Sequence, residues 1–292
     1  TDSERCGAMG GSDLTVLNPL QNAFLGVSAG TIEVIILQPL LYCKNAVQQG
    51  LPLTLNPMVL YRGVSVSVIN MSILTGIQFP MAGAIGNLMT GGVDRPLGDS
   101  EKIGAGLCSG LLSGFICGPM ELIMIQQQRF GTSLIDATKK IVSEYGVFGA
   151  GLYRGLAVSA GREGAFTAGY LGLGPVFAGM LKERKAMDPK MCDFAGAAGA
   201  GMIAASVSHP LDTIKTNMQG DIERKVYTDM TGTARTLYQQ GGYGMFFKGW
   251  AIRTGRMICA IWLIGQCKDR LGPVFYPHLL GPDAKKKADP AM

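Results

Sequence analysis

Charged residues are scarce in this chain of 292 residues. Asp, Glu, Lys and Arg make up 16% of it, whereas soluble globular domains carry about a quarter. The net charge is only +5, and the densest basic cluster, Lys285-Lys286-Lys287, lies close to the C-terminal end. This composition favours a membrane protein and argues against nucleic acid as a partner.

Cysteine and histidine lack the spacings that chemistry requires. The seven cysteines contain no CxxC pair and have no neighbouring histidine, so we expect neither a disulfide framework nor a metal site. One of the two histidines, His209, directly precedes a proline, and the other, His278, lies near the C-terminal end. Because no nucleophile–base pair or phosphate-binding loop is recognisable, we expect no cofactor and no enzymatic activity.

Six long stretches with few charges are present instead. They cover residues 17–43, 64–91, 103–125, 156–181, 194–214 and 250–267, each near the roughly 20 residues that cross a bilayer as a helix. Glycines recur at helical spacing within them, as at Gly106, Gly110 and Gly114, which lets helices approach closely in lipid. The sequence therefore predicts an all-α membrane protein with six transmembrane helices.

Three marks recur three times in the same order: a proline, a glutamine nine residues later, and an aromatic-basic-glycine triplet. They are Pro39, Gln48 and Tyr61-Arg62-Gly63; Pro119, Gln128 and Tyr153-Arg154-Gly155; Pro210, Gln219 and Phe247-Lys248-Gly249. Such regularity indicates a threefold repeat. We place the repeats at residues 17–99, 100–189 and 190–272, between an N-terminal extension (1–16) and a C-terminal tail (273–292).

The proline mark belongs to the pattern Pro-x-(Asp/Glu)-x-x-(Lys/Arg), and together with the glutamine and the triplet it resembles the mitochondrial carrier family over about residues 17–272. The resemblance implies three pseudo-symmetric helix-loop-helix repeats around a central cavity. It also implies a multi-pass protein of the inner mitochondrial membrane that transports a small-molecule metabolite.

In that family the acid of one repeat pairs with the base of the next and closes the matrix side, where the prolines bend the helices. Carried over, Glu121 pairs with Lys215, and Asp212 with Lys44. The third pair has lost both charges together. It would join Leu41 to Met124.

This joint loss has two interpretations, namely an apolar contact that replaces an ion pair or independent losses in a decaying protein. The resemblance also implies that Gln48, Gln128 and Gln219 brace the pairs, while the plain alternative is a surface position.

Three arginines lie deep within the even-numbered stretches: Arg162, Arg253 and Arg256. Each would cost about 2.5–3.5 kcal/mol or more if it faced lipid at mid-bilayer, so we expect them to face a wet cavity or a partner. The seventh residue after each triplet glycine is Asn70, Arg162 or Arg256, and these positions match the family's substrate contact points. Arg253, one turn before Arg256, shares its face.

The adjacent pair Arg162 and Glu163 resembles carriers of amino acids and related zwitterions, because a guanidinium binds carboxylates and a carboxylate binds an ammonium. The alternative is that the two residues neutralise each other or their neighbours. Glu33 resembles a glutamate in some carriers of citrate and oxo-dicarboxylates, and two or three cavity arginines would also suit a di- or tricarboxylate.

The three triplets resemble the family's cardiolipin sites, where helix amides and a nearby base hold a phosphate. This implies bound cardiolipin as a lipid partner. Interfacial anchoring by Tyr and Arg, with no particular lipid, is the alternative.

The chain departs from the family pattern in two places. The aromatic-acid-x-x-base motif expected at the cytoplasmic ends of the even helices is nowhere intact, and of its acids only Asp269 remains. This end therefore closes by packing of small residues or closes poorly. In the first repeat, residues 51–60 contain Pro52 and Pro57 and cannot form the amphipathic helix expected at residues 133–145 and 227–240.

Two functions follow from these patterns. The first is a transporter that exchanges an amino-acid-like or carboxylate metabolite by alternating access. The alternative is a carrier-fold structural subunit of a larger respiratory-chain complex that no longer transports, which the missing motif and the short first repeat would favour.

Overall fold

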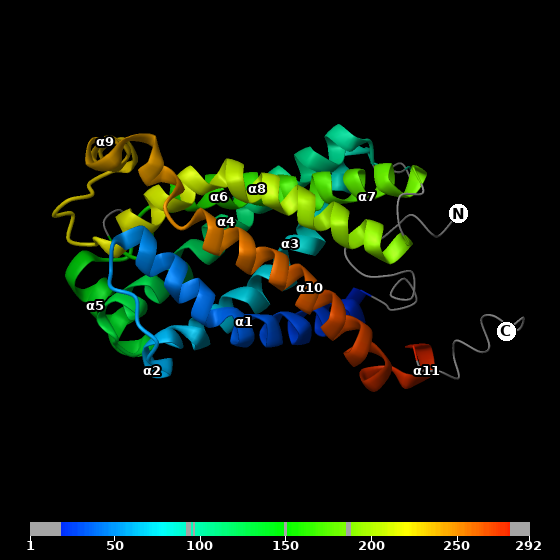
Figure 1. Cartoon of the computed structure of the whole chain (residues 1–292), viewed down its shortest axis with the longest axis horizontal. Helices are drawn as coiled ribbons and strands as arrows, with labels where there is room; N and C mark the ends of the chain where they lie inside the picture. The colour runs from blue at the N-terminus through cyan, green and yellow to red at the C-terminus, as the bar shows by residue number, and fades with distance from the viewer. Residues whose placement is uncertain (1–18, 92–94, 96, 149–150, 185–187, 281–292) are drawn as a thin grey trace, which may run out of the picture.

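The computed structural model describes residues 19–91, 95, 97–148, 151–184 and 188–280. Within these ranges the chain is entirely helical, without strands (Figure 1). The long helices are α1 (Pro19–Gln49), α3 (Val64–Met89), α4 (Asp99–Phe130), α8 (Pro189–Gly220) and α10 (Trp250–Phe275). A further long segment consists of α6 (Leu156–Thr167), a π-helical turn (Ala168–Leu173) and α7 (Gly174–Glu183). Shorter elements are α2 (Pro57–Leu60), α5 (Leu134–Tyr145), α9 (Met230–Gly241), a 3₁₀ turn (Gly242–Phe247) and α11 (Pro277–Leu280).

Four segments of the described chain are long and apolar enough to cross a membrane by themselves. They are Ala23–Gln49, Pro57–Met89, Asp99–Phe130 and Met191–Gly220. The two remaining crossings, α6 to α7 and α10, contain the three arginines expected to face a wet cavity or a partner, and the first is interrupted by the π-helical turn. These features explain why these two crossings carry a weaker apolar signal than the other four.

Glycine allows α4 and α6 to pack backbone to backbone. A Cβ atom added at Gly110 would lie 2.7 Å from the carbonyl oxygen of Glu163, and one at Gly114 would lie 2.5 Å from Cα of Ala160. Gly106 likewise faces the backbone at the start of the π-helical turn. The helical glycine spacing therefore marks a real interface of the kind that membrane helices favour.

Helices α2, α5 and α9 gather at one end of the molecule, opposite α7 and α11 (Figure 1). Helices α5 and α9 begin with capping side chains: Ser133 accepts a hydrogen bond from the amide of Asp136, and Asp229 accepts one from Gly232. In the first repeat the corresponding segment contains only the four-residue α2. Pro52 and Pro57 predicted that no amphipathic helix would form there. That prediction is confirmed.

The three repeats share an unusual backbone feature. The triplet glycines Gly63, Gly155 and Gly249 immediately precede α3, α6 and α10 with φ angles of +79°, +72° and +82°. Only glycine adopts this left-handed conformation without steric cost, which explains its place in the triplet. At the C-terminal end, α10 continues to Phe275, so the first residues of the expected tail are helical, while residues 1–16 lie outside the described chain.

Candidate functional site

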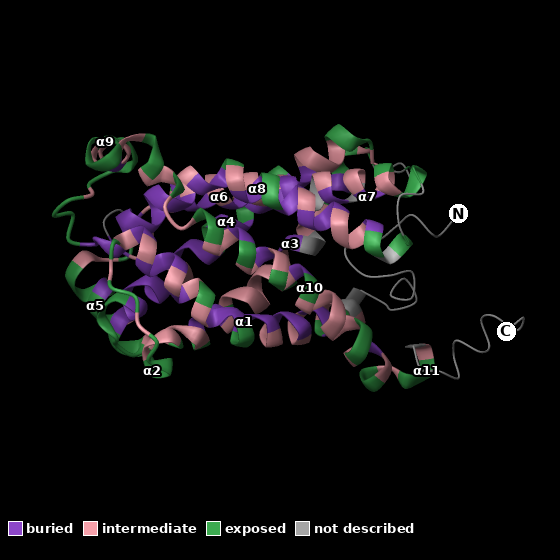
Figure 2. Ribbon diagram, in the orientation of Figure 1, coloured by how far each residue is buried: buried purple, intermediate pink, exposed green. Residues whose placement is uncertain are grey.

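The first, third and fifth membrane crossings are α1, α4 and α8, which we call the odd helices. They meet at the end that carries α5 and α9. Beyond Pro39, Pro119 and Pro210 each helix continues for roughly three turns, in which most residues are buried although many are polar (Figure 2). Buried polar groups need partners. The contacts of these residues therefore define the centre of the molecule.

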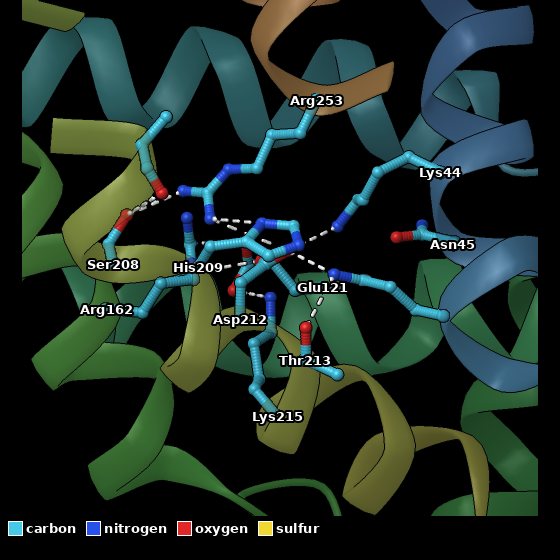
Figure 3. A network of polar contacts seen from close by, with 12 residues as sticks. Lys44, Asn45, Glu121, Arg162, Ser208, His209, Asp212, Thr213, Lys215 and Arg253 are labelled. Atoms are coloured by element: carbon cyan, nitrogen blue, oxygen red, sulfur yellow. Dashed lines mark hydrogen bonds and ion pairs between the residues drawn. The ribbon is translucent and has the colours of Figure 1, made fainter. Parts of the chain in front are cut away.

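Two ion pairs cross between these helices (Figure 3). Lys44 of α1 donates to Asp212 of α8 with 2.8 Å between Nζ and Oδ2, and Lys215 of α8 lies 2.6 Å from Oε2 of Glu121 on α4. The structure thus brings together both partner pairs that the sequence pattern specified. They join α8 to α1 and α4 to α8.

Arg162 of α6 connects the two pairs. Its Nη2 atom lies 2.7 Å from Glu121 Oε1 and 2.6 Å from Glu163 Oε2, and its Nε lies 3.8 Å from Asp212 Oδ1. The sequence suggested the neighbouring Glu163 as a partner but not Glu121, which is distant in the chain and lies on another helix. Arg162, which was expected at a substrate contact point, thus contacts a carboxylate of each of the two ion pairs, Glu121 and Asp212.

Arg253 of α10 also approaches the carboxylate of Asp212, at the other of its two oxygens. Its Nη1 lies 3.7 Å from Asp212 Oδ2, and its Nη2 donates to Ser208 Oγ at 2.9 Å. His209 is fully buried beside it, with Nε2 3.1 Å from the carbonyl oxygen of Lys248 and Nδ1 3.5 Å from Arg253. A carbonyl only accepts, so Nε2 carries the proton and Nδ1 accepts from Arg253. The sequence gave no reason to expect a role for this histidine.

We call these linked residues the central network. Its charged members are Lys44, Glu121, Arg162, Glu163, Asp212, Lys215 and Arg253.

A separate ion pair lies between α1 and α10. Arg256 Nη2 is 2.8 Å from Glu33 Oε1, and Glu33 is almost fully buried. The sequence singled out both residues independently, each as an isolated charge within a span. The structure shows that they compensate each other.

The predicted contact points share one property. Asn70 Oδ1, Arg162 Nε and Arg256 Nε are buried and form no hydrogen bond within the described chain. These three atoms come from three equivalent positions of the repeats. Unpartnered buried polar atoms are costly, and a polar molecule bound at these positions would satisfy them.

Leu41 and Met124 occupy the position of the absent third ion pair. Met124 belongs to a buried apolar cluster with Val66 and Leu122, and Leu41 packs against this cluster. Ser67 donates to the Met124 sulfur at 3.1 Å. Both side chains thus lie in an apolar environment, which favours the interpretation of a replaced ion pair.

The three glutamines are all buried, so a surface position is wrong for them. Gln48 donates to Asp212 at 2.9 Å and braces that pair as expected. For the other two the expectation needs correction. Gln128 accepts from Asn45, because no ion pair exists at its level, and Gln219 approaches the carbonyls of Gly118 and Arg154, because Arg162 already occupies Glu121.

A second set of contacts lies about one helical turn beyond the ion pairs. Asn45 donates to Gln128 Oε1 at 2.6 Å, Asn217 to the carbonyl of Gln48 at 3.3 Å, and Gln126 to the carbonyl of Gln219 at 2.5 Å. These bonds join α1 to α4, α8 to α1 and α4 to α8. We call this set the amide layer.

Sequence reasoning missed the amide layer. The signal was available, since amide side chains are dense at the C-terminal ends of the three odd helices. The layer connects every pair of odd helices, including the pair that lacks an ion pair.

Replacing Asn45 with leucine, which is similar in size and cannot hydrogen-bond, is expected to destabilise the protein by about 1–3 kcal/mol, because it leaves Gln128 buried without its donor. The double variant Asn45→Leu with Gln128→Leu removes both polar groups and is expected to recover part of the loss. Thermal unfolding of the detergent-purified protein measures both changes. A double variant less stable than the sum of the single variants would show that the bond does not account for the effect.

The triplet residues differ in what their side chains do. Arg154 is buried, and its Nε and Nη2 donate to the carbonyls of Met218 and Tyr227 at 2.6 and 2.5 Å. Its guanidinium thus secures the loop after α8, so the expectation that this side chain holds a lipid phosphate needs correction. Tyr61 is exposed, and the guanidinium of Arg62 lies against Gly131 at the end of α4.

The loop held by Arg154 also contains a buried acid, Asp221. Its Oδ2 accepts the backbone amides of Val226 and Tyr227 at 2.7 and 2.8 Å. Burial by itself raises the pKa of Asp221, but these amides and the nearby Arg154 more than offset it, so the pKa is lowered. This acid is therefore ionised at neutral pH and fixes the loop.

One surface groove lies beside the third triplet. It has a volume of about 740 Å³, opens to the outside between α1, α8 and α10, and is lined mainly by apolar side chains. Its walls include Val47, Phe247, Gly249 and Trp250. The position at the start of α10 matches one predicted lipid site.

A family model described as mitochondrial carrier protein matches residues 97–185 and 188–271, more than half of the chain. The chain belongs to the mitochondrial carrier family. Members of this family carry small-molecule metabolites, so this carrier is a mitochondrial membrane protein that binds such a metabolite.

The chain is similar to curated carriers of amino acids and of carboxylates. A mitochondrial glycine transporter of Yarrowia lipolytica is 25% identical over 278 residues, which cover 81% of this chain and 88% of the relative. A tricarboxylate transport protein of Saccharomyces cerevisiae is 25% identical over 281 residues, covering 83% and 91%. A glutamate/glycine mitochondrial carrier of Schizosaccharomyces pombe is 30% identical over 162 residues, covering 50% and 52%.

Proposed function

We propose that this carrier exchanges an amino-acid-like or carboxylate metabolite across the inner mitochondrial membrane by alternating access. The observation that carries the proposal is the set of unpartnered polar atoms on Asn70, Arg162 and Arg256 at equivalent positions of the three repeats. A guanidinium binds a carboxylate with charge-assisted hydrogen bonds. The relatives named above transport metabolites of these two classes.

In this proposal the central network and the amide layer form the matrix gate, and the structure is the state in which that gate is closed. Arg162 couples the gate to the substrate because the same guanidinium binds Glu121 of the gate and offers Nε to the substrate. A substrate carboxylate at Arg162 competes with Glu121 for this guanidinium and weakens the link between α6 and α4. A ligand shifts a conformational equilibrium only through such a difference in affinity.

The cytoplasmic gate would close differently. The equivalent ends of the even helices are rich in small residues, and the contacts there suit close packing: Gly86 faces the side chain of Leu97, and Gly196 faces the backbone of Ala178. The ion pairs recorded at this end, Lys182 with Asp193 and Arg95 with Glu101, are partly exposed, unlike the buried pairs of the other end. We therefore propose that the matrix gate is the more strongly held of the two.

Lipid belongs to the same proposal. The groove has apolar walls and includes the N-terminus of α10. Lys248 lies two residues before the first residue of this helix. Helix N-termini favour phosphate groups, so cardiolipin is the lipid that we expect here and beside the other two triplet glycines. Trp250 donates to Ser206 at 2.9 Å and shapes this groove.

Reconstitution in liposomes tests the proposed function. Vesicles loaded with an unlabelled amino acid or carboxylate are expected to take up the labelled compound by exchange, and empty vesicles are not. Absence of exchange across a panel of amino acids, dicarboxylates and tricarboxylates would instead support the structural-subunit alternative. Co-purification with a respiratory complex at fixed stoichiometry would then identify that role.

A further inference from the structure

The charges of the central network do not balance. It contains four cations and three carboxylates, all buried or nearly so and linked by the ion pairs described above. The separate pair of Glu33 and Arg256 is neutral and contributes no net charge. One positive charge is therefore left without a compensating carboxylate in the network, in a position where an uncompensated charge is costly.

The surplus charge lies at Arg253. The other three cations each have a carboxylate oxygen within 2.8 Å, whereas among the described residues Arg253 has an ion-pair contact only with Asp212, at 3.7 Å. That same oxygen, Oδ2, already accepts from Lys44 and Gln48. The shorter contact of Arg253 is with the neutral hydroxyl of Ser208.

A second guanidinium lies near this charge, on the other oxygen of the Asp212 carboxylate. Arg253 and Arg162 approach Asp212 on different oxygens, at 3.7 and 3.8 Å, and Arg162 keeps its Nε without a hydrogen bond. Figure 3 shows Ser208 and His209 close to Arg253. His209 is neutral and accepts from Arg253, so it supplies no negative charge.

Glu163 does not fill the role of an ammonium acceptor. One of its carboxylate oxygens accepts from Arg162, and the other accepts from Gln78 of α3 at 3.1 Å. Gln78 also contacts Thr167 at 2.8 Å, and Glu163 is almost fully buried. This acid is thus committed to holding Arg162, which makes it a positioning residue.

From this balance we propose that the substrate carries one net negative charge and that Arg253, together with Arg162, binds its carboxylate. This inference rests on the proposed function and narrows it. The favoured substrates are an acidic amino acid or a monocarboxylic acid, because either restores neutrality when bound. A neutral amino acid leaves the surplus in place, and a tricarboxylate reverses and enlarges the imbalance.

A substrate panel on the wild-type protein tests the proposal that the substrate carries one net negative charge, which we call the charge rule. The probes are L-glutamate and pyruvate with one net negative charge, glycine with none, 2-oxoglutarate with two and citrate with three. Thermal shift of the detergent-purified protein reports binding even when transport is absent. Half-maximal stabilisation by L-glutamate or pyruvate is expected at concentrations about tenfold or more below those of glycine and citrate, a ratio that corresponds to a modest difference in binding free energy.

The two proposals fail in distinguishable ways. Stabilisation by a monoanion without any liposome exchange would support the charge rule and overturn transport. Exchange of glycine or citrate in preference to the monoanions would support transport and overturn the charge rule.

A matched pair of variants supplies the stricter test. Ser208→Asp places a carboxylate against Arg253 and neutralises the surplus, while Ser208→Asn has nearly the same shape and no charge. We expect Ser208→Asp to weaken monoanion binding by about 100-fold and Ser208→Asn by about threefold or less, since a buried charge-assisted contact is worth far more than a neutral one. The stability of each unliganded variant shows that it is folded.

If Ser208→Asp does not fold, Arg253→Gln removes the same charge by a different route. It is expected to abolish the preference for monoanions over glycine. Equal binding of monoanions by the Asp and Asn variants, or a preference that survives Arg253→Gln, would overturn the proposal.

Discussion

Replacing Asp212 with asparagine is expected to lower the melting temperature of the purified carrier by on the order of 10 °C, corresponding to a loss of about 3 kcal/mol or more. Asp212 contacts Lys44, Arg162 and Arg253 and accepts from Gln48. Its loss leaves four buried cations with only two carboxylates. Thermal unfolding in detergent, followed by intrinsic fluorescence, measures the change.

Lys44→Gln is the matched control, because it breaks the same ion pair from the other side. Lys44 has Asp212 as its sole ion-pair partner among the described residues, whereas Asp212 keeps two arginines when Lys44 is removed. The network then has three cations and three carboxylates, so we expect a loss below about 1.5 kcal/mol. Equal losses for the two variants, or a greater loss for Lys44→Gln, would contradict the charge imbalance on which this ranking depends.

The fold was largely predictable because its marks are local. A proline, a glutamine and a left-handed glycine each impose their effect within a few residues, and three copies of one unit repeat the information. The missing matrix helix of the first repeat followed from Pro52 and Pro57 in the same way. The weak point was α6, where the sequence gave no warning of the π-helical turn after Thr167.

The site was predictable only where repeats specify partners. The pairs Glu121 with Lys215 and Asp212 with Lys44 follow from equivalent positions in successive repeats. The contact of Arg162 with Glu121 breaks this rule, because it joins an even helix to an odd one, and its formation depends on how closely α6 approaches α4. Periodicity within a helix identifies a face but not the residue that lies opposite.

The pairing of Arg256 with Glu33 likewise could not be predicted from helix periodicity. Each residue was recognisable as a charge that must avoid lipid, yet neither pattern named the other, since they lie on the first and last long helices. The consequence concerns function, because a neutralised Glu33 no longer argues by itself for a particular substrate. The charge balance of the whole network is the better guide to the substrate.

Replacing Arg162 with lysine is expected to reduce substrate exchange by about 100-fold while the protein stays folded. Lysine keeps the positive charge, but an ammonium on a flexible chain cannot reproduce the planar group that reaches Glu121, Glu163 and the substrate together. The loss should therefore appear in the maximal exchange rate as well as in the apparent affinity. Labelled counter-exchange in liposomes at several substrate concentrations separates the two.

The control is Arg235→Lys, an exposed arginine on α9 that no proposal involves. It is expected to exchange substrate at the wild-type rate. If Arg162→Lys raised only the half-saturating concentration and left the maximal rate unchanged, Arg162 would bind substrate without coupling it to the gate, because a substrate that does not compete with Glu121 has no means of opening it. An unchanged rate and affinity would remove Arg162 from the site altogether, whereas the expected double loss ties substrate recognition and gate opening to one guanidinium.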